Sequence, residues 1–171
     1  VAIPLPEHFK RSLSSYQRSM PRRAARDVRW AEPNAIHLTL RFLGDVNPIK
    51  IDEISKSLCL AANSSGKFKL KIGRPGGFPS VYSPRVLWVG IAGETNRLKQ
   101  LHGRIEGAVL STGFLPENRR FEPHLTIGRI QSRAPRGSDS VVGNYFRKLK
   151  FNVDSFQVSR IVLFRSHLHH T

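Results

Sequence analysis

The chain has 171 residues, of which 28 are Lys or Arg and 12 are Asp or Glu, so its formal charge is +16 with the histidines neutral. Hydrophobic residues make up 39% of the sequence, enough for a folded core, which excludes wholesale disorder. No apolar run approaches the roughly 18 residues that a membrane span needs. Because Cys59 is the single cysteine, we expect neither an intramolecular disulfide nor a multi-cysteine zinc site, and we expect a reducing, cytoplasmic location.

From the amino terminus, the pattern predicts a strand, a helix, a second strand and a second helix. The first strand opens on an apolar run without Met, so we expect further residues before it. The first helix has apolar residues at spacings of three and four, and the second strand alternates apolar with polar residues. An arginine-rich segment between them is predicted to be an exposed connector. In chain order these segments are residues 1–5, 6–20, 22–29 (the connector), 36–43 and 48–61.

The second half of the chain predicts two strands, a helix, a strand, a polar loop and two final strands. A glycine- and proline-rich loop is expected between the first two strands. The segments are residues 68–72, 73–79 (the loop), 85–91, 95–109, 124–130, 131–140 (the polar loop), 151–153 and 156–164. Several consecutive strands favour an α+β fold with antiparallel pairing over a doubly wound parallel sheet.

One short pattern occurs twice in the chain. His37-Leu-Thr39 is echoed by His124-Leu-Thr126, with the two histidines 87 positions apart. A His-x-Thr triplet is expected by chance only roughly 0.2 times in a chain of this composition. The echo therefore predicts two similar lobes. For one isolated triplet, the alternative is a histidine on the solvated face of an amphipathic strand.

The two triplets predict acid and base chemistry on a phosphodiester. Residues i and i+2 of a strand share a face, so each imidazole has a threonine hydroxyl beside it. A histidine pKa of about 6.5 allows one ring to be neutral and the other protonated near neutral pH. A neutral His could then take a proton from attacking water while a protonated His gives one to the leaving ribose oxygen. The hydroxyls would stabilise the non-bridging oxygens, so this chemistry requires no metal ion and no cofactor.

The paired triplets resemble the HXTX signatures of the two-histidine (2H) phosphoesterase superfamily. The sequence around them is similar to that of the bacterial RNA 2′,3′-cyclic phosphodiesterase family, also called 2′-5′ RNA ligases. The similar segments include Leu-Thr-Leu-Arg-Phe-Leu-Gly at residues 38–44 and Phe-Glu-Pro-His at residues 121–124. The resemblance spans almost the whole chain. It implies one two-lobed catalytic domain over residues 1–171. Its α+β fold would have two antiparallel sheets related by a pseudo-twofold axis around a central cleft, with helices on the outer faces.

The same resemblance implies an activity and roles for the histidines. RNA 2′,3′-cyclic phosphate ends, including those of tRNA fragments, would be hydrolysed to 2′-phosphates, with reversible 2′-5′ joining of RNA ends as a related activity. His37 would be the proton donor and His124 the proton acceptor. A monomer away from membranes is expected. The family continues after Ser166 into a further closing strand, which we expect beyond Thr171.

Four other residues are candidate substrate contacts. Arg41 lies four positions after His37 and would share its face in a regular strand. Arg129 lies five positions after His124, on the opposite face unless the strand ends or bulges first. Phe42 and Phe78 are candidates for stacking on a base, although for Phe42 core packing is the favoured alternative.

No metal site is predicted, because His167, His169 and His170 have no carboxylate or cysteine companion at ligand spacing. Two other functions remain open from the sequence alone. The first is a non-catalytic RNA-binding protein that keeps the charge. The second is a phosphodiesterase for small cyclic nucleotides or 2′-5′ oligonucleotides.

Overall fold

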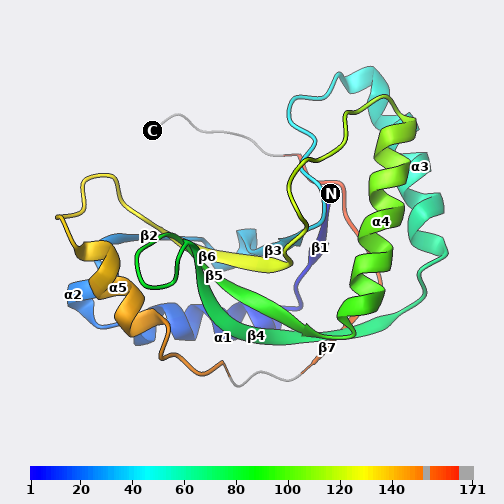
Figure 1. Cartoon of the computed structure of the whole chain (residues 1–171). Helices are drawn as coiled ribbons and strands as arrows, with labels where there is room; N and C mark the ends of the chain where they lie inside the picture. Colours follow the sequence, from blue (N-terminus) through cyan, green and yellow to red (C-terminus); the bar gives the residue numbers. More distant parts are fainter. Residues whose placement is uncertain (152–154, 166–171) are drawn as a thin grey trace.

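Two antiparallel sheets and five α-helices form an α+β fold in the computed structural model, which describes residues 1–151 and 155–165 (Figure 1). The strands are β1 (Ala2–Pro4), β2 (Val28–Trp30), β3 (His37–Thr39), β4 (Phe68–Pro79), β5 (Pro84–Gly93), β6 (His124–Ile130) and β7 (Phe156–Val158). The α-helices are α1 (Glu7–Ser19), α2 (Arg22–Ala25), α3 (Ile51–Asn63), α4 (Thr95–Ser111) and α5 (Ser138–Phe146). Two 3₁₀ turns complete the set, η1 (Pro33–Ala35) and η2 (Pro48–Lys50).

The two sheets differ in size. The smaller one pairs β1 with β3, and the larger one has the order β2-β6-β5-β4-β7 with every neighbouring pair antiparallel. The segment after β7 returns to the small sheet, where Ala2 and Val162 exchange backbone hydrogen bonds of 3.0 and 2.8 Å. The predicted pair of antiparallel sheets is thus confirmed, while the pseudo-twofold axis stays a prediction.

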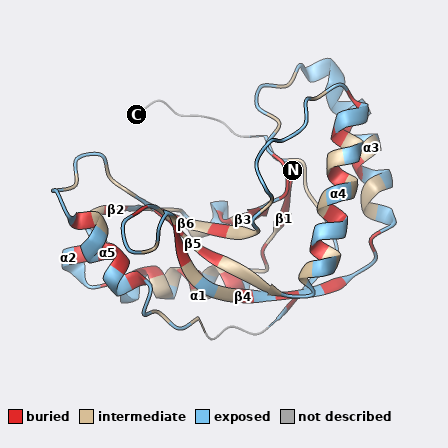
Figure 2. Ribbon diagram, in the orientation of Figure 1, coloured by how far each residue is buried: buried red, intermediate tan, exposed pale blue. Residues whose placement is uncertain are grey.

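The core lies between the sheets and the helices that cover them. Helix α1 runs along one face of the large sheet, below it in Figure 1, and buries Phe9 and Leu13 completely. Its Gln17 side-chain amide donates to the backbone carbonyls of Ala31, at 2.8 Å, and Ile127, at 3.1 Å. These bonds join α1 to the strand that carries His124. Helices α3 and α4 pack on each other at the other end of the molecule, and each turns a buried side inward (Figure 2).

The predicted helices and most predicted strands are confirmed, with three corrections in the first half of the chain or at its end. The strand predicted at residues 36–43 ends at Thr39. The connector at residues 22–29 contains α2 and the start of the edge strand β2. The predicted strand at residues 151–153 is not tested, because residues 152 and 153 lie outside the described part. The strand predicted at residues 156–164 ends at Val158, followed by the single bridge at Val162.

The glycine-rich segment at residues 73–79 is not a loop but part of the long strand β4. Its pairing with β5 is irregular between Ile72 and Pro75 and then resumes, with Gly76 opposite Trp88. A Cβ atom at Gly76 would overlap the Trp88 ring, so only glycine lets this strand pass over the indole. Gly76 therefore allows β4 and the Trp88 ring to pack closely, whereas the sequence pattern predicted a loop. Helix α5, likewise, begins inside the polar loop predicted at residues 131–140.

Within the described residues, no helix combines the length and the apolar character required to cross a bilayer.

Candidate active site

The strands that carry the two His-x-Thr triplets lie side by side. His37 and Thr39 are the ends of β3 in the small sheet, and β6 begins with His124 in the large sheet. Strand β3 packs against β6, as Figure 1 also shows. In both triplets the middle leucine is fully buried, while the histidines are partly exposed. The expected alternation is present: the leucines anchor the strands and the polar residues face away from the core.

His124 has a defined tautomer. Its Nδ1 lies 2.6 Å from the backbone carbonyl oxygen of Glu122. A carbonyl can only accept, so Nδ1 carries the proton and donates. In the neutral ring, Nε2 then bears the lone pair, which is the state that a proton acceptor requires.

His37 has the same local arrangement. It hydrogen-bonds to the backbone of Ala35, which is also two residues earlier in the chain. Its ring stacks on Phe164, with ring centroids 5.1 Å apart and planes inclined by 18°. Burial of the imidazole lowers the pKa of His37 below its ordinary value, and the hydrogen bond to Ala35 opposes part of that shift.

An aromatic cavity of about 410 Å³ opens beside His124. The edge of the Phe78 ring meets the imidazole at a centroid distance of 5.2 Å, and the Trp88 ring lies 5.8 Å from it. The indole Nε1 of Trp88 is buried and has no hydrogen-bond partner among the described residues. The cavity is lined by Phe78, Trp88, Gly90, Ile91, Lys99, Arg120, Phe121, Glu122, Pro123 and His124.

Sequence reasoning missed several of these residues. Phe78 is among the candidates, but Trp88 has the pattern of a core residue within an apolar strand. Lys99 comes from α4, and nothing in the sequence separates it from the other surface lysines. Arg120 and Phe121 directly precede the Glu-Pro-His sequence, and this position next to the motif is the one signal that could have identified them.

Strand register places the second threonine and Arg129 on one face. Thr126 pairs with Trp88 and His124 pairs with Gly90, so both share the face of the cavity. The register then shifts, because Leu87 pairs with Gly128 and Val86 with Arg129. This bulge returns Arg129 to the face of Thr126. The opposite-face placement expected for a regular strand does not occur.

Arg41 lies elsewhere than predicted. Its side chain is only 8% exposed, and its guanidinium forms ion pairs of 3.2 Å with Glu106 and with Glu117. It also donates to the carbonyl of Leu115 at 2.6 Å. The strand ends at Thr39, so the alternation that would have placed Arg41 beside His37 does not reach it. In this structure Arg41 joins the end of β3 to α4 and to the segment leading toward His124, and its contact with phosphate stays a prediction.

Phe42 is 74% exposed, so the favoured expectation of core packing is wrong and a stacking role stays a prediction. Thr39 is exposed and shares the face of His37 by strand alternation. His167, His169 and His170 lie outside the described residues. Inside residues 1–151 and 155–165, no group of three or more His, Cys, Asp or Glu side chains is placed to hold a metal ion.

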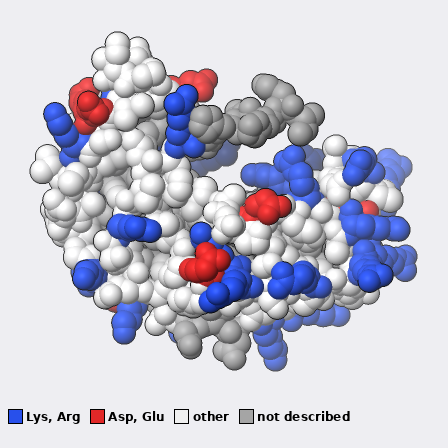
Figure 3. All heavy atoms as spheres, turned by 180° about the vertical axis from the view of Figure 1, so that it is seen from behind, with Lys and Arg blue, Asp and Glu red and all other residues white. Residues whose placement is uncertain are grey.

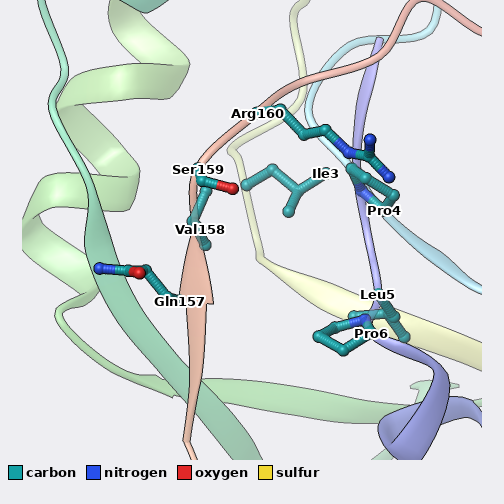
Figure 4. Close-up of a pocket in the computed structure, with 8 residues that line it drawn as sticks. All are labelled: Ile3, Pro4, Leu5, Pro6, Gln157, Val158, Ser159 and Arg160. Atoms are coloured by element: carbon teal, nitrogen blue, oxygen red, sulfur yellow. The ribbon is translucent and has the colours of Figure 1, made fainter.

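A second cavity, of about 250 Å³, contains none of the predicted site residues. It lies between β1 and the segment around β7, and Figure 4 shows Arg160 reaching across it toward Pro4. Its lining is mostly aliphatic and proline side chains, without an acid and base pair. The candidate active site of this chain is therefore the region of β3 and β6.

Three curated relatives are 30–34% identical to this chain over the aligned residues. The RNA 2′,3′-cyclic phosphodiesterase of Aquifex aeolicus is 34% identical over 141 residues, which are 82% of this chain and 73% of the relative. The enzyme of that name from Geobacillus stearothermophilus is 32% identical, over 100% of this chain and 52% of the relative. The one from Thermotoga maritima is 30% identical, over 92% and 83%. The chain thus spans between about half and five-sixths of the length of these relatives.

Solved structures agree with the fold. E. coli LigT in its apo form has a TM-score of 0.62 and 25% identity, covering 92% of this chain and 80% of that one. The protein TT0787 of Thermus thermophilus, at 23% identity and a TM-score of 0.68, shares the fold over 92% of this chain and 81% of its own. The model of the LigT-like phosphoesterase family matches the chain twice, over residues 3–88 and 89–171. One His-x-Thr triplet falls in each match, and this chain therefore belongs to the LigT-like phosphoesterase family.

Proposed function

We propose that this chain is a metal-independent RNA 2′,3′-cyclic 3′-phosphodiesterase, with reversible 2′-5′ RNA ligation as a related activity. The observation that carries the proposal is the pair of histidines on adjacent strands. Each has a hydrogen bond to the backbone two residues earlier and a threonine two residues later. The names of the relatives from Aquifex, Geobacillus and Thermotoga support the same activity. In the proposal, residues 1–171 act as one two-lobed catalytic domain.

His124 is the proton acceptor in this mechanism. Its Nδ1–H is held by Glu122, so Nε2 takes a proton from the attacking water as the water oxygen bonds to phosphorus. His37 is the proton donor, and it protonates the 3′ oxygen as the bond from phosphorus to that oxygen breaks. The product is a 2′-phosphate with a free 3′ hydroxyl. Thr39 and Thr126 donate hydrogen bonds to the non-bridging oxygens, where negative charge is concentrated.

The cavity beside His124 supports a nucleotide as the group that carries the reacting phosphate. Phe78, Trp88 and Phe121 offer aromatic surface to a base. E. coli LigT has also been solved with 3′-AMP. The substrates proposed are RNA ends, including those of tRNA fragments. A monomer in the cytoplasm is part of the same proposal, and the single cysteine supports the location.

Hydrolysis of a 2′,3′-cyclic mononucleotide in excess EDTA tests the function directly. We expect turnover to persist, and we expect His37→Ala and His124→Ala each to lower kcat by about 10² to 10⁴, the usual contribution of a positioned acid or base. His8→Ala is the matched control, because His8 is exposed on α1. Loss of turnover on chelation, with recovery on adding a divalent ion, would refute the metal-independent mechanism. Absence of turnover in the wild type would favour the non-catalytic RNA-binding alternative, and turnover that is equal in the wild type and in all three variants would show that the two histidines do not catalyse it.

The remaining alternative, an enzyme for small cyclic nucleotides or 2′-5′ oligonucleotides, shares this chemistry and differs only in what lies beyond the reacting phosphate. A comparison of kcat/KM for a cyclic mononucleotide and for an RNA oligomer with the same end separates the two functions.

A further inference from the structure

Arg29 of the edge strand β2 lies on the same face of the large sheet as the second His-x-Thr triplet. In the register of β2 with β6, Arg29 is directly opposite Arg129. Arg129 is in turn opposite Val86, which shares a face with Trp88 and therefore with Thr126. A row of residues thus leads from the site to the edge of the sheet. The bulge in β6 is what aligns this row with the triplet.

The pair formed by Arg29 and Arg129 is electrostatically unfavourable in the isolated protein. Both side chains are exposed, and like charges directly opposite on neighbouring strands repel each other. Within residues 1–151 and 155–165, the ion pairs of the structure include neither arginine. Two exposed arginines directly opposite each other on neighbouring strands can both donate to an anion with several acceptor oxygens, such as a phosphodiester.

The surface beyond Arg29 continues with the same sign of charge. Residues 22–30 and 129–150 contain ten Lys and Arg but only two acidic residues. Both acidic groups have partners of their own: Asp27 pairs with Arg26 at 3.8 Å, and Asp139 accepts a hydrogen bond from Ser83. Figure 3 shows Lys and Arg gathered at this end of the molecule, which carries α2 and α5. The end that carries α3 and α4 shows both signs.

We infer that Arg29, together with Arg129, binds the phosphodiester next to the reacting phosphate, so that an RNA strand leaves the site across β6 and β2 toward this basic end. The inference rests on the proposed function and adds to it a binding residue, Arg29, and a path for the RNA strand. The preferred substrate is a single-stranded RNA oligomer, and a lone cyclic nucleotide leaves the pair of arginines empty. Arg29 contacts the strand beyond the reacting group and takes no part in proton transfer.

Arg29→Gln tests this inference with two substrates, a 2′,3′-cyclic mononucleotide and a five-nucleotide RNA with the same cyclic end. We expect kcat/KM for the oligomer to fall about fivefold or more at low salt, and kcat/KM for the mononucleotide to stay unchanged. The slope of log kcat/KM against log salt for the oligomer should become shallower by about 0.7, the contribution of one neutralised phosphate on a single strand. Arg29→Lys, which keeps a point charge, should recover most of the slope.

Arg11→Gln is the matched control. It removes the same charge from an exposed position on α1, which covers the other face of the sheet, and should leave both substrates unaffected. Arg29→Gln should also leave the melting temperature unchanged or raise it, because it relieves the repulsion with Arg129.

Three outcomes would overturn the inference while leaving the proposed function intact. They are a wild type with no preference for the oligomer, equal effects of Arg29→Gln and Arg11→Gln, and an equal loss on both substrates in a folded Arg29→Gln protein. Absence of turnover on either substrate by the wild type would instead refute the proposed function itself.

Discussion

At the scale of single residues, the two histidines have the same local environment but different surroundings. Each hydrogen-bonds to the backbone two residues earlier, which orients the ring. His124 faces an open aromatic cavity, whereas His37 lies against Phe164 and is partly desolvated. Burial lowers the pKa of His37 and so disfavours its protonated form, and the proposed donor role therefore requires the negative phosphate of the bound substrate to favour the imidazolium.

The pKa of His37 is the first testable quantity. Burial penalises the imidazolium, so the midpoint of an NMR titration of His37 in the free protein should lie below the ordinary histidine value of about 6.5. A bound phosphate anion favours the imidazolium, so adding inorganic phosphate should move the midpoint upward. The signal is assigned by its loss in His37→Ala. A midpoint above 6.5 without phosphate would contradict the effect of burial.

The direction of proton transfer is tested with a better leaving group. A general acid matters less as the leaving group becomes less basic, so replacing the 3′ oxygen with a low-pKa leaving group should largely restore the rate of His37→Ala. His124→Ala should stay slow, because the attacking water still lacks its base. The measurement is the ratio of rates on activated and natural substrates for each variant. Restoration of His124→Ala in place of His37→Ala would reverse the two roles.

At the scale of secondary structure, the sequence predicted the elements better than their ends. Helices α1 and α4 and strand β6 follow from the spacing of their apolar residues, and the histidines and threonines of both triplets lie on strands as expected. The end of β3 did not follow, because Leu40 and Arg41 continue the alternating pattern after the pairing with β1 has stopped. Sequence periodicity cannot show that Arg41 is buried, because its ion-pair partners Glu106 and Glu117 come from distant parts of the chain.

The bulge in β6 could not be predicted from the sequence either. Its position depends on where β5 stops matching β6 between Leu87 and Trp88, and that depends on long-range packing. The face of Arg129, and with it the reach of the site toward Arg29, therefore required the structure. The aromatic cavity is a similar case, since its walls come from four separate segments.

Arg41 provides a prediction at this scale. Arg41→Met should lower the free energy of unfolding by about 2–4 kcal/mol, because it removes the guanidinium from the largely buried Glu106 carboxylate and leaves only His102, at 4.0 Å, beside it. Glu117→Gln should lower it by less than about 1 kcal/mol, since Glu117 is 42% exposed and its ion pair is accessible to solvent. Urea unfolding of both variants measures the difference. If Arg41→Met keeps full stability but raises KM for the cyclic mononucleotide many-fold, Arg41 contacts phosphate after all.

At the scale of the whole molecule, charge and topology act together. The five-stranded sheet ends at β2, and that edge adjoins the segments richest in Arg. The proposed site lies where β3 of the small sheet packs against β6, and the proposed path of the RNA runs from there along the large sheet. Part of the formal charge of +16 thus lies beside the proposed path of the substrate, and the rest is distributed over the remaining surface.

This distribution predicts different salt dependences for long and short substrates. For the wild type, log kcat/KM on the five-nucleotide RNA should fall with log salt at a slope of about −1.4 or steeper, because at least two phosphates beyond the reacting one release their counterions on binding. The cyclic mononucleotide has no such phosphates, so its slope should be close to zero once general screening is subtracted. Steady-state kinetics between low and physiological salt, with constant pH and in EDTA, measure both slopes. Equal slopes for the two substrates would mean that the charge acts only as a diffuse field, and the basic end of the molecule would then have no specific part in holding RNA.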